Sequence, residues 1–135
     1  MVTARECHWG SFMGRILLVD DTSYAKQLLN RILSGNGHEI VGEASDGIEG
    51  IEKYKTLMPD LVLMDMIMPR MGGMECMDEI LKFDRNAKIL VVSADSQGDH
   101  VADTIRKGSL GYINKPFKKE TVLEEVNIIL RESGR

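Results

Sequence analysis

Residues 61–69 read LVLMDMIMP, and this stretch decides what kind of fold the chain can form. The run that opens it, LVLM, is wholly apolar, which is typical of a strand that is covered on both faces, as in a parallel sheet. The run ends at one carboxylate, Asp65, and Pro69 closes the stretch. Met66 to Pro69 do not have the pattern of a helix that Asp65 would cap. A structural explanation for Asp65 is therefore weak, and a functional one has to be considered.

Short apolar runs of this kind recur along the chain and are separated by amphipathic segments. Most of them are continuously apolar, as strands inside a parallel sheet are. The runs with the length of strands are residues 16–19, 38–44, 61–64, 89–92 and 111–113. The chain thus alternates between strands and segments long enough for helices.

The segments between the strands have apolar residues at helical spacing. The clearest pattern, ended by Gly35 and Gly37, consists of Ala25, Leu28, Leu29, Ile32 and Leu33. Other helical segments contain Ile48 and Ile51, Met74, Met77 and Leu81, Val101 and Ile105, and Val122, Val126, Ile129 and Leu130. Five strand–helix pairs predict an α/β fold, a doubly wound five-stranded parallel sheet with helices on both faces.

Length and composition restrict the function as well. A chain of 135 residues with 28% charged and 43% hydrophobic residues fits one globular domain. Its net charge of -4 gives no general attraction to nucleic acid or to an anionic membrane. The apolar runs are too short to cross a bilayer, and the N-terminus lacks the pattern of a secretory signal. We therefore expect a cytoplasmic protein with no nucleic-acid partner and no membrane insertion.

The N-terminal residues differ in pattern from the remainder of the chain. Residues 1–12 share no periodicity with residues 13–135, and we interpret them as an N-terminal extension or a cloning remnant, with residues 13–135 as the domain. The sequence has two cysteines, Cys7 and Cys76, far apart. In a reducing compartment we expect both to be free thiols.

Polar side chains follow four of the expected strands at their carboxyl ends. Asp20 and Asp21 follow the first strand, Asp65 the third, Ser93 the fourth and Lys115 the fifth. Taken singly, Asp21 could cap a helix, Ser93 could be a turn hydroxyl and Lys115 a solvated charge. Ligands of open α/β sheets bind outside the carboxyl ends of the strands, so the joint placement favours a functional site.

The charges of this group indicate its chemistry. Two like charges about 4 Å apart near a protein surface repel by ~4 kcal/mol at an effective dielectric constant of 20, so the carboxylates require a cation. Oxygen ligands without Cys or His favour Mg²⁺. A divalent ion, a lysine and a hydroxyl around Asp65 predict phosphoryl transfer, with Asp65 as a nucleophile that forms an aspartyl phosphate.

These residues resemble the receiver domain of two-component response regulators. The resemblance covers residues 14 to about 133 and includes Asp20-Asp21, the stretch from Asp65 to Pro69, Ser93-Ala94 and Lys115-Pro116-Phe117, in the family's order and spacing. It implies a flavodoxin-like (β/α)5 fold with strand order 2-1-3-4-5. No output domain follows in the sequence, so the resemblance is strongest to the stand-alone chemotaxis members of the family.

The resemblance also implies a role for each residue. Asp65 would be the phosphoacceptor. Asp21, Asp65 and the carbonyl of Ile67 would bind Mg²⁺ directly, with Asp20 acting largely through water. Lys115 would pair first with Asp65 and then with its phosphoryl group.

Five positions carry further implied roles or depart from the family pattern. Ser93 would hydrogen-bond the phosphoryl group, and Tyr112 matches an aromatic that turns inward when this hydroxyl moves. Without the rest of the pattern, Tyr112 would be an ordinary half-buried strand tyrosine. Ile67 and Asp95 match positions that tune hydrolysis, and Ile67 cannot orient a water. Met66 stands where many members have an aromatic residue.

Four functions are compatible with the sequence to different degrees. The first is a signalling switch, not an enzyme, that accepts a phosphoryl group from a histidine kinase on Asp65. It would control a downstream target such as the flagellar motor or its adaptor. The second is a phosphorelay intermediate that passes the group to another histidine protein. A Mg²⁺-dependent phosphatase of the haloacid dehalogenase type would require an Asp where Ile67 stands. A flavodoxin-like cofactor protein would require a Ser-, Thr- or Gly-rich loop after the first strand.

Overall fold

In the computed structural model, which describes residues 13–94 and 98–133, five strands and five helices alternate along the described chain. The strands are β1 (Arg15–Val19), β2 (Glu39–Ala44), β3 (Leu61–Met64), β4 (Ile89–Ser93) and β5 (Tyr112–Asn114). The helices are α1 (Ser23–Ser34), α2 (Gly47–Leu57), α3 (Gly73–Phe83), α4 (Gly98–Lys107) and α5 (Lys119–Ser133). Each expected strand and helix is therefore present, with bounds that shift by a residue or two.

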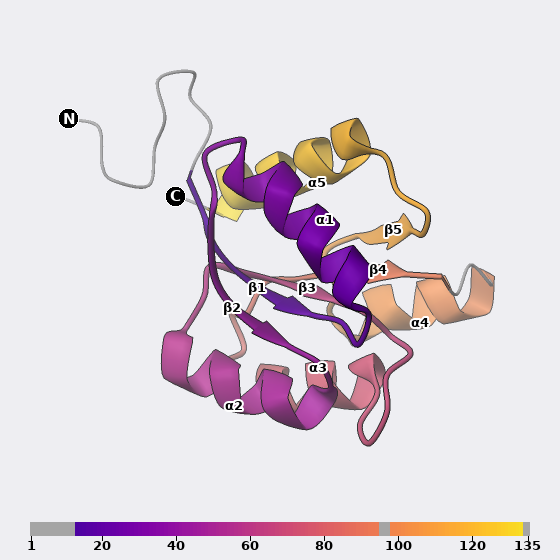
Figure 1. Ribbon diagram of the computed structural model, residues 1–135. Coiled ribbons are helices and arrows are strands. Elements are labelled where there is room, and N and C mark those ends of the chain that lie inside the picture. The colour runs from indigo at the N-terminus through magenta and orange to yellow at the C-terminus, as the bar shows by residue number, and fades with distance from the viewer. Residues whose placement is uncertain (1–12, 95–97, 134–135) are drawn as a thin grey trace.

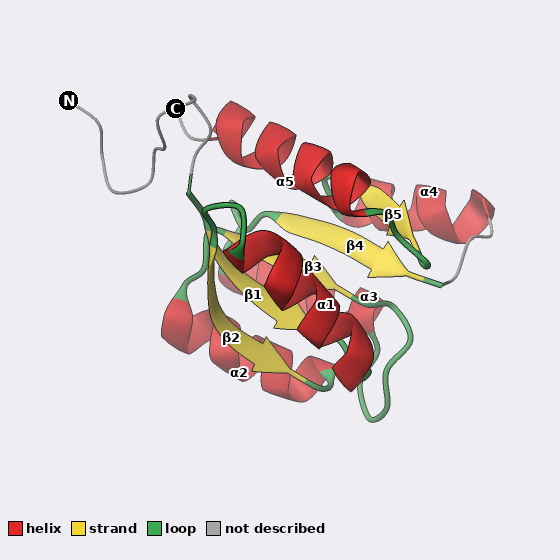
Figure 2. Cartoon of the chain, turned by 45° about the horizontal axis from the view of Figure 1, so that its top comes forward, coloured by secondary structure: helices red, strands yellow, loops and turns green. Residues whose placement is uncertain are grey.

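The strands form one parallel sheet in the order β2-β1-β3-β4-β5. This confirms the doubly wound fold and the strand order that the family resemblance implies. Helices α1 and α5 cover one face of the sheet, and α2 and α3 cover the other (Figure 1). Helix α4 contacts α3 and lies beside the β5 edge (Figure 2).

Two hydrophobic cores flank the sheet because successive strand residues point to opposite faces. In β1, Ile16 and Leu18 pack toward α1 and α5, while Leu17 and Val19 pack toward α2 and α3. All four side chains are fully buried. The continuous apolar runs of the sequence are thus explained by burial on both faces of the sheet.

The register of the sheet brings the carboxyl ends of the central strands together. Val19 of β1 is paired with Met64 of β3, so that Asp20 and Asp65 follow directly on neighbouring strands. The amide of Asp65 continues the ladder by donating to the carbonyl of Val19 at 2.9 Å. On the other side of the site, the amide of Lys115 donates to the carbonyl of Ser93 at 2.9 Å. Backbone pairing alone therefore brings these residues together at the carboxyl ends of the strands.

Helix α4 differs in detail from its sequence pattern. Ile105, which we expected on the buried face, is 52% exposed, whereas the neighbouring Thr104 is buried. The Thr104 hydroxyl donates to the carbonyl of Val101 at 2.8 Å, which satisfies it inside the helix. A threonine thus takes the buried position at this point of α4.

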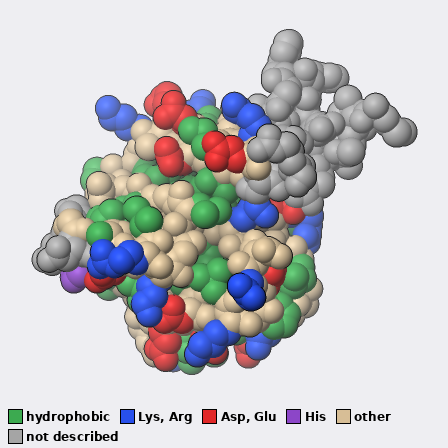
Figure 3. Space-filling view, turned by 180° about the vertical axis from the view of Figure 1, so that it is seen from behind, with side chains coloured by type: hydrophobic (Ala, Val, Ile, Leu, Met, Phe, Trp, Pro, Cys, Tyr) green, Lys and Arg blue, Asp and Glu red, His purple; other side chains and the backbone are tan. Residues whose placement is uncertain are grey.

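Several other expectations concern the ends and the surface of the chain. Cys76 is buried and is a free thiol, as expected. Cys7 and Asp95 lie outside the described residues. Among residues 13–94 and 98–133, no helix combines the length and the apolar character needed to cross a membrane. On the face that Figure 3 shows, acidic and basic side chains are interspersed with hydrophobic ones.

Candidate functional site

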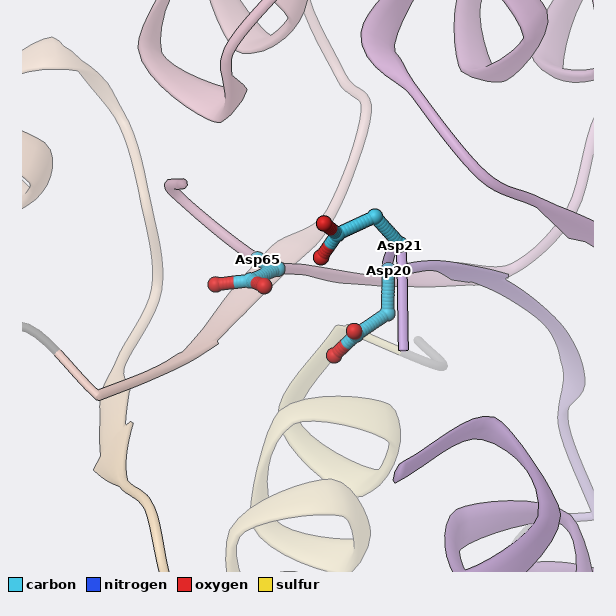
Figure 4. A group of neighbouring side chains, drawn as sticks. All are labelled: Asp20, Asp21 and Asp65. Carbon is cyan, nitrogen blue, oxygen red and sulfur yellow. The ribbon is translucent and has the colours of Figure 1, made fainter. Parts of the chain in front are cut away.

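Three carboxylates meet where β1 and β3 end. Asp20, Asp21 and Asp65 each offer an oxygen, and these oxygens all lie within 4.8 Å of one another. Figure 4 shows the Asp21 carboxylate turned toward that of Asp65. Asp20 and Asp65 are buried, whereas Asp21 is exposed. The cluster therefore has a buried side and a side open to solvent.

The carboxylate of Asp20 accepts three short hydrogen bonds within the protein. One of its oxygens accepts from the amide of Thr22 at 2.8 Å and from the Thr22 hydroxyl at 2.6 Å. Its other oxygen accepts from the Lys115 ammonium at 2.6 Å. Thr22 is the N-cap of α1 but caps it without a side-chain bond. Asp20 thus fixes the turn between β1 and α1, and one of its oxygens accepts only the bond from Lys115.

The carboxylate of Asp65 is held much more loosely. Its Oδ1 accepts from the amide of Ile67 at 3.4 Å, and its Oδ2 accepts from Lys115 Nζ at 3.4 Å. Both contacts are long for charge-assisted hydrogen bonds, which have lengths of about 2.7–2.9 Å. A buried anion with two weak partners keeps its oxygen lone pairs available for a stronger ligand.

Burial and neighbouring charges set the protonation of the group. Burial raises the pKa of the Asp65 carboxyl above its ordinary value, and although Lys115 opposes this, the charge of Asp20 adds to it. Burial would lower the pKa of the Lys115 ammonium. The hydrogen bond to Asp20 and the charge of Asp65 outweigh that effect, so this pKa is raised. The three carboxylates and one ammonium leave an excess of negative charge that a cation would stabilise.

Mg²⁺ fits the donor set of this cluster. All three side chains offer hard oxygen ligands, and the exposed position of Asp21 leaves room for the waters that Mg²⁺ retains. Ile67 would contribute only its carbonyl, because its side chain is apolar and 62% exposed. The assignment of Asp20, Asp21, Asp65 and Ile67 to the metal stays a prediction.

The remaining predicted residues lie on β4, which pairs with β3, and on β5, which pairs with β4. Ser93 is the last residue of β4 and is fully buried. Tyr112 is the first residue of β5 and is partly buried. The sheet pairs Ser93 with Asn114, the residue before Lys115. The structure thus places the hydroxyl and the ammonium on adjacent strands, and the switching role of Ser93 and Tyr112 stays a prediction.

One pair near the site was missed in the sequence. Asp46 caps α2, its Oδ1 accepting from the amide of Glu49 at 2.9 Å, and Arg70 of the loop after β3 donates to its other oxygen. The sequence could have identified Asp46 as a helix cap, because an Asp followed three residues later by Glu is typical of the start of a helix. No local pattern identifies Arg70 as its partner.

Comparison with known proteins agrees with this fold. The chain belongs to the response regulator receiver domain family, because the sequence model of that family matches residues 16–127. It is 44% identical over 113 residues to the chemotaxis protein CheY of Thermotoga maritima, covering 84% of this chain and 94% of that protein. Protein CcdB of Bacillus subtilis is 38% identical over 118 residues, covering 87% of this chain and 98% of that protein.

A solved structure shows the same fold with ligands bound. It is the crystal structure of the CheX–CheY–BeF3–Mg²⁺ complex from Borrelia burgdorferi, with a TM-score of 0.86 and 32% identity. The likeness covers 96% of this chain and 98% of that one. Receiver domains accept a phosphoryl group and bind Mg²⁺ through acidic residues, and this chain has such an acidic cluster.

Proposed function

We propose that this protein is a phosphorylation-dependent signalling switch that accepts a phosphoryl group on Asp65 from a histidine kinase, with Mg²⁺ bound at the carboxylate cluster. The observation that carries the proposal is the contrast between two buried carboxylates. Asp20 has three hydrogen bonds of 2.8 Å or less, whereas both contacts of Asp65 are 3.4 Å long. Asp65 is therefore the buried carboxylate with an oxygen available for chemistry.

The transfer requires little from the protein beyond position and charge. An Asp65 oxygen forms a bond to phosphorus while the bond from phosphorus to the donor's histidine nitrogen breaks, and that nitrogen keeps the electron pair and takes up a proton. Bound Mg²⁺ would supply positive charge for the phosphoryl oxygens. Lys115, 2.6 Å from Asp20 and 3.4 Å from Asp65, is placed to contact the transferred group.

Incubation with acetyl phosphate and Mg²⁺, followed by intact-mass spectrometry, tests the assignment. We expect one added phosphoryl group on the native protein, none on Asp65→Asn, and none on the native protein when Mg²⁺ is chelated. Asp103→Asn is the matched control, because this carboxylate lies on α4 in an exposed pair with Arg106. Undiminished labelling of Asp65→Asn would show that Asp65 is not the acceptor.

We further infer that the protein acts in chemotaxis in the cytoplasm and that it passes its signal to a downstream partner protein. The support is the similarity to a protein named for chemotaxis and the exposed apolar side chains of α4, α5 and the segment before β5. Ile105 of α4 and Leu110 before β5 are each 52% exposed, and Ile128 of α5 is 39% exposed. Apolar side chains on neighbouring elements are typical of a protein-binding surface.

A phosphorelay intermediate is the second candidate, because an aspartyl phosphate on Asp65 can also be attacked by a histidine nitrogen of another protein, which then takes over the phosphoryl group. The phosphorylated protein, freed of its donor, can be mixed with a histidine phosphotransfer protein from the same genome. Transfer of the label to histidine faster than hydrolysis would favour the relay. Hydrolysis alone, together with phosphate-dependent binding of a motor component, would favour the chemotaxis role.

A further inference from the structure

The loop between β3 and α3 has an uncommon backbone at one residue. This loop, residues 65–72, begins with Asp65 and contains the carbonyl of Ile67. Arg70 within it has φ +64°, the left-handed region that side chains with a Cβ rarely adopt. Such residues persist where the surrounding structure holds them, and they gather at functional sites. What holds Arg70 is therefore a question about the site.

The side chain of Arg70 is bound to a buried carboxylate on another element. Its Nε donates to Oδ2 of Asp46 at 2.9 Å, and its Nη2 donates to the same oxygen. The Asp46 side chain is only 5% exposed, although the Arg70 side chain is 67% exposed. Because the other Asp46 oxygen caps α2 through the amide of Glu49, the carboxylate connects this helix with the loop.

The backbone reinforces the same connection. The amide of Gly47, the first residue of α2, donates to the carbonyl of Met71 at 3.0 Å. A Cβ at Gly47 would lie 2.8 Å from that carbonyl oxygen, so the close approach requires glycine. At the far end of the loop, the amide of Gly73 donates to the carbonyl of Met66 at 3.0 Å. The loop is thus held against α2 on one side and closed on itself on the other.

We propose that Asp46 and Arg70 are a positioning pair that fixes the β3–α3 loop so that Asp65 and the Ile67 carbonyl can bind the same Mg²⁺. The inference rests on the proposed function. Mg²⁺ demands near-ideal octahedral geometry at about 2.0–2.1 Å, so a small shift of the loop weakens its binding. Arg70 acts through the loop backbone and Asp46 through the start of α2.

Three substitutions test the ion pair of Asp46 and Arg70 independently of the left-handed backbone conformation of Arg70. Arg70→Asn tolerates the left-handed region but is too short to reach Asp46. Arg70→Lys keeps the charge without the fork of donors. Asp46→Asn keeps an oxygen that can cap α2 but removes the charge. Arg106→Ala is the control, because Arg106 lies in an exposed pair on α4.

Two measurements test the proposal. Amide hydrogen exchange of the metal-free protein reports on the loop, and calorimetric titration gives the Kd for Mg²⁺. For Arg70→Asn and Asp46→Asn we expect faster exchange at Gly47 and Met71 and a Kd about 10-fold weaker, the lower end of the effect of residues that orient metal ligands. Arg70→Lys should be intermediate. The double variant should be no worse than the singles, because both remove the same interaction.

Native exchange rates and an unchanged Kd in Arg70→Asn would overturn the proposal. So would a loss of global stability with the Kd unchanged, since a purely structural pair would give that result. These outcomes differ from a failure of the proposed function, in which Asp65→Asn would still be labelled by acetyl phosphate. The labelling experiment and the titration can therefore fail independently.

Discussion

Lys115 lies closer to Asp20 than to Asp65: its Nζ is 2.6 Å from Oδ2 of Asp20 and 3.4 Å from Oδ2 of Asp65. The ammonium therefore neutralises the carboxylate that already accepts two short hydrogen bonds from Thr22. Asp65, which has the longer contacts, keeps its charge available to whatever enters the cluster. The side chain of Lys115 is 19% exposed, so its charge is only partly screened by solvent.

Replacing Lys115 by Met should strengthen Mg²⁺ binding while destabilising the metal-free protein. Met keeps an apolar stem of similar length but removes a cation from the neighbourhood of the metal. A unit charge and a divalent ion about 4 Å apart repel by roughly 2 kcal/mol even in water, so the Kd should fall about 10- to 30-fold. Calorimetric titration at physiological salt measures it. Lys107→Met, in a half-exposed pair with Asp78, is the control, and an unchanged Kd for Lys115→Met would contradict the argument.

Ser93→Ala should leave phosphorylation measurable and weaken its coupling to the partner. Phosphorylation adds negative charge and acceptor oxygens at Asp65, which should draw in the Ser93 hydroxyl. Without that hydroxyl, the difference in partner affinity between the phosphorylated and free forms should shrink by about 5-fold or more. Partner titrations with and without acetyl phosphate give this ratio. A ratio equal to that of the native protein would exclude Ser93 from the switch.

Tyr112→Ala should change partner binding with little effect on the Kd for Mg²⁺. Tyr112 opens β5, whose pairing with β4 places it opposite Val91 rather than at the carboxylates. Movement of Ser93 would make room for the ring to turn inward and alter the surface of α4, β5 and α5. A crystal structure of the beryllium fluoride complex checks this. If Ser93 and Tyr112 kept the positions of the free protein there, the switch mechanism would be wrong even with Asp65 correctly assigned.

Ile67→Asn should change the lifetime of the phosphorylated protein without changing its stability. The Ile67 side chain is 62% exposed, so its replacement should alter the free energy of unfolding by less than about 0.5 kcal/mol. The Asn amide can orient a water molecule, which the Ile67 side chain cannot do. We therefore expect dephosphorylation about 10-fold faster, a small factor beside those of groups that assist proton transfer. Phosphate release after donor removal measures the rate. The Kd for Mg²⁺ should be nearly native, and an identical rate would refute the role.

The stability of the metal-free protein should fall below pH 6.5 because of His38. Its Nδ1 accepts from the amide of Gly14 at 3.1 Å, so that the neutral ring donates from Nε2 to Asn127, also at 3.1 Å. Burial lowers the pKa of His38 below 6.5, although the Asn127 bond opposes this. As the pH falls, His38 is therefore protonated at a higher pH in the unfolded chain than in the folded protein. The stabilising contribution of the neutral His38 ring is fully present above pH 6.5. It is lost as the pH falls toward the lower pKa that His38 has in the folded protein, by at most ~1.4 kcal/mol per pH unit.

Denaturant unfolding at about pH 7.5 and about pH 5.5 tests this linkage. His38→Gln does not titrate, so its stability should change less between the two conditions than that of the native protein. Equal losses in the native protein and in His38→Gln would assign the acid sensitivity to other groups.

The sequence alone determined the order of the elements and the residues at the ends of the strands. A buried parallel strand must be apolar on both faces, so runs such as LVLM and ILVV mark the sheet without any knowledge of its partners. Because carboxyl ends of parallel strands share one edge, Asp20, Asp65 and Lys115 could be expected to meet. Helix α4 shows the limit of such patterns, since Thr104 is buried there while Ile105 is 52% exposed.

Only the tertiary structure decided which of the gathered groups bind one another. Lys115 and Asp20 are 95 residues apart, His38 and Asn127 are 89 apart, and Arg70 and Asp46 are 24 apart. Local periodicity shows which face of an element is buried, but not the register between elements or the path of a loop. Those depend on how the two cores pack against the sheet. The carboxylate cluster was therefore predictable from the strand ends, whereas the difference in hydrogen bonding between Asp20 and Asp65 arises only when the packed elements set the distances.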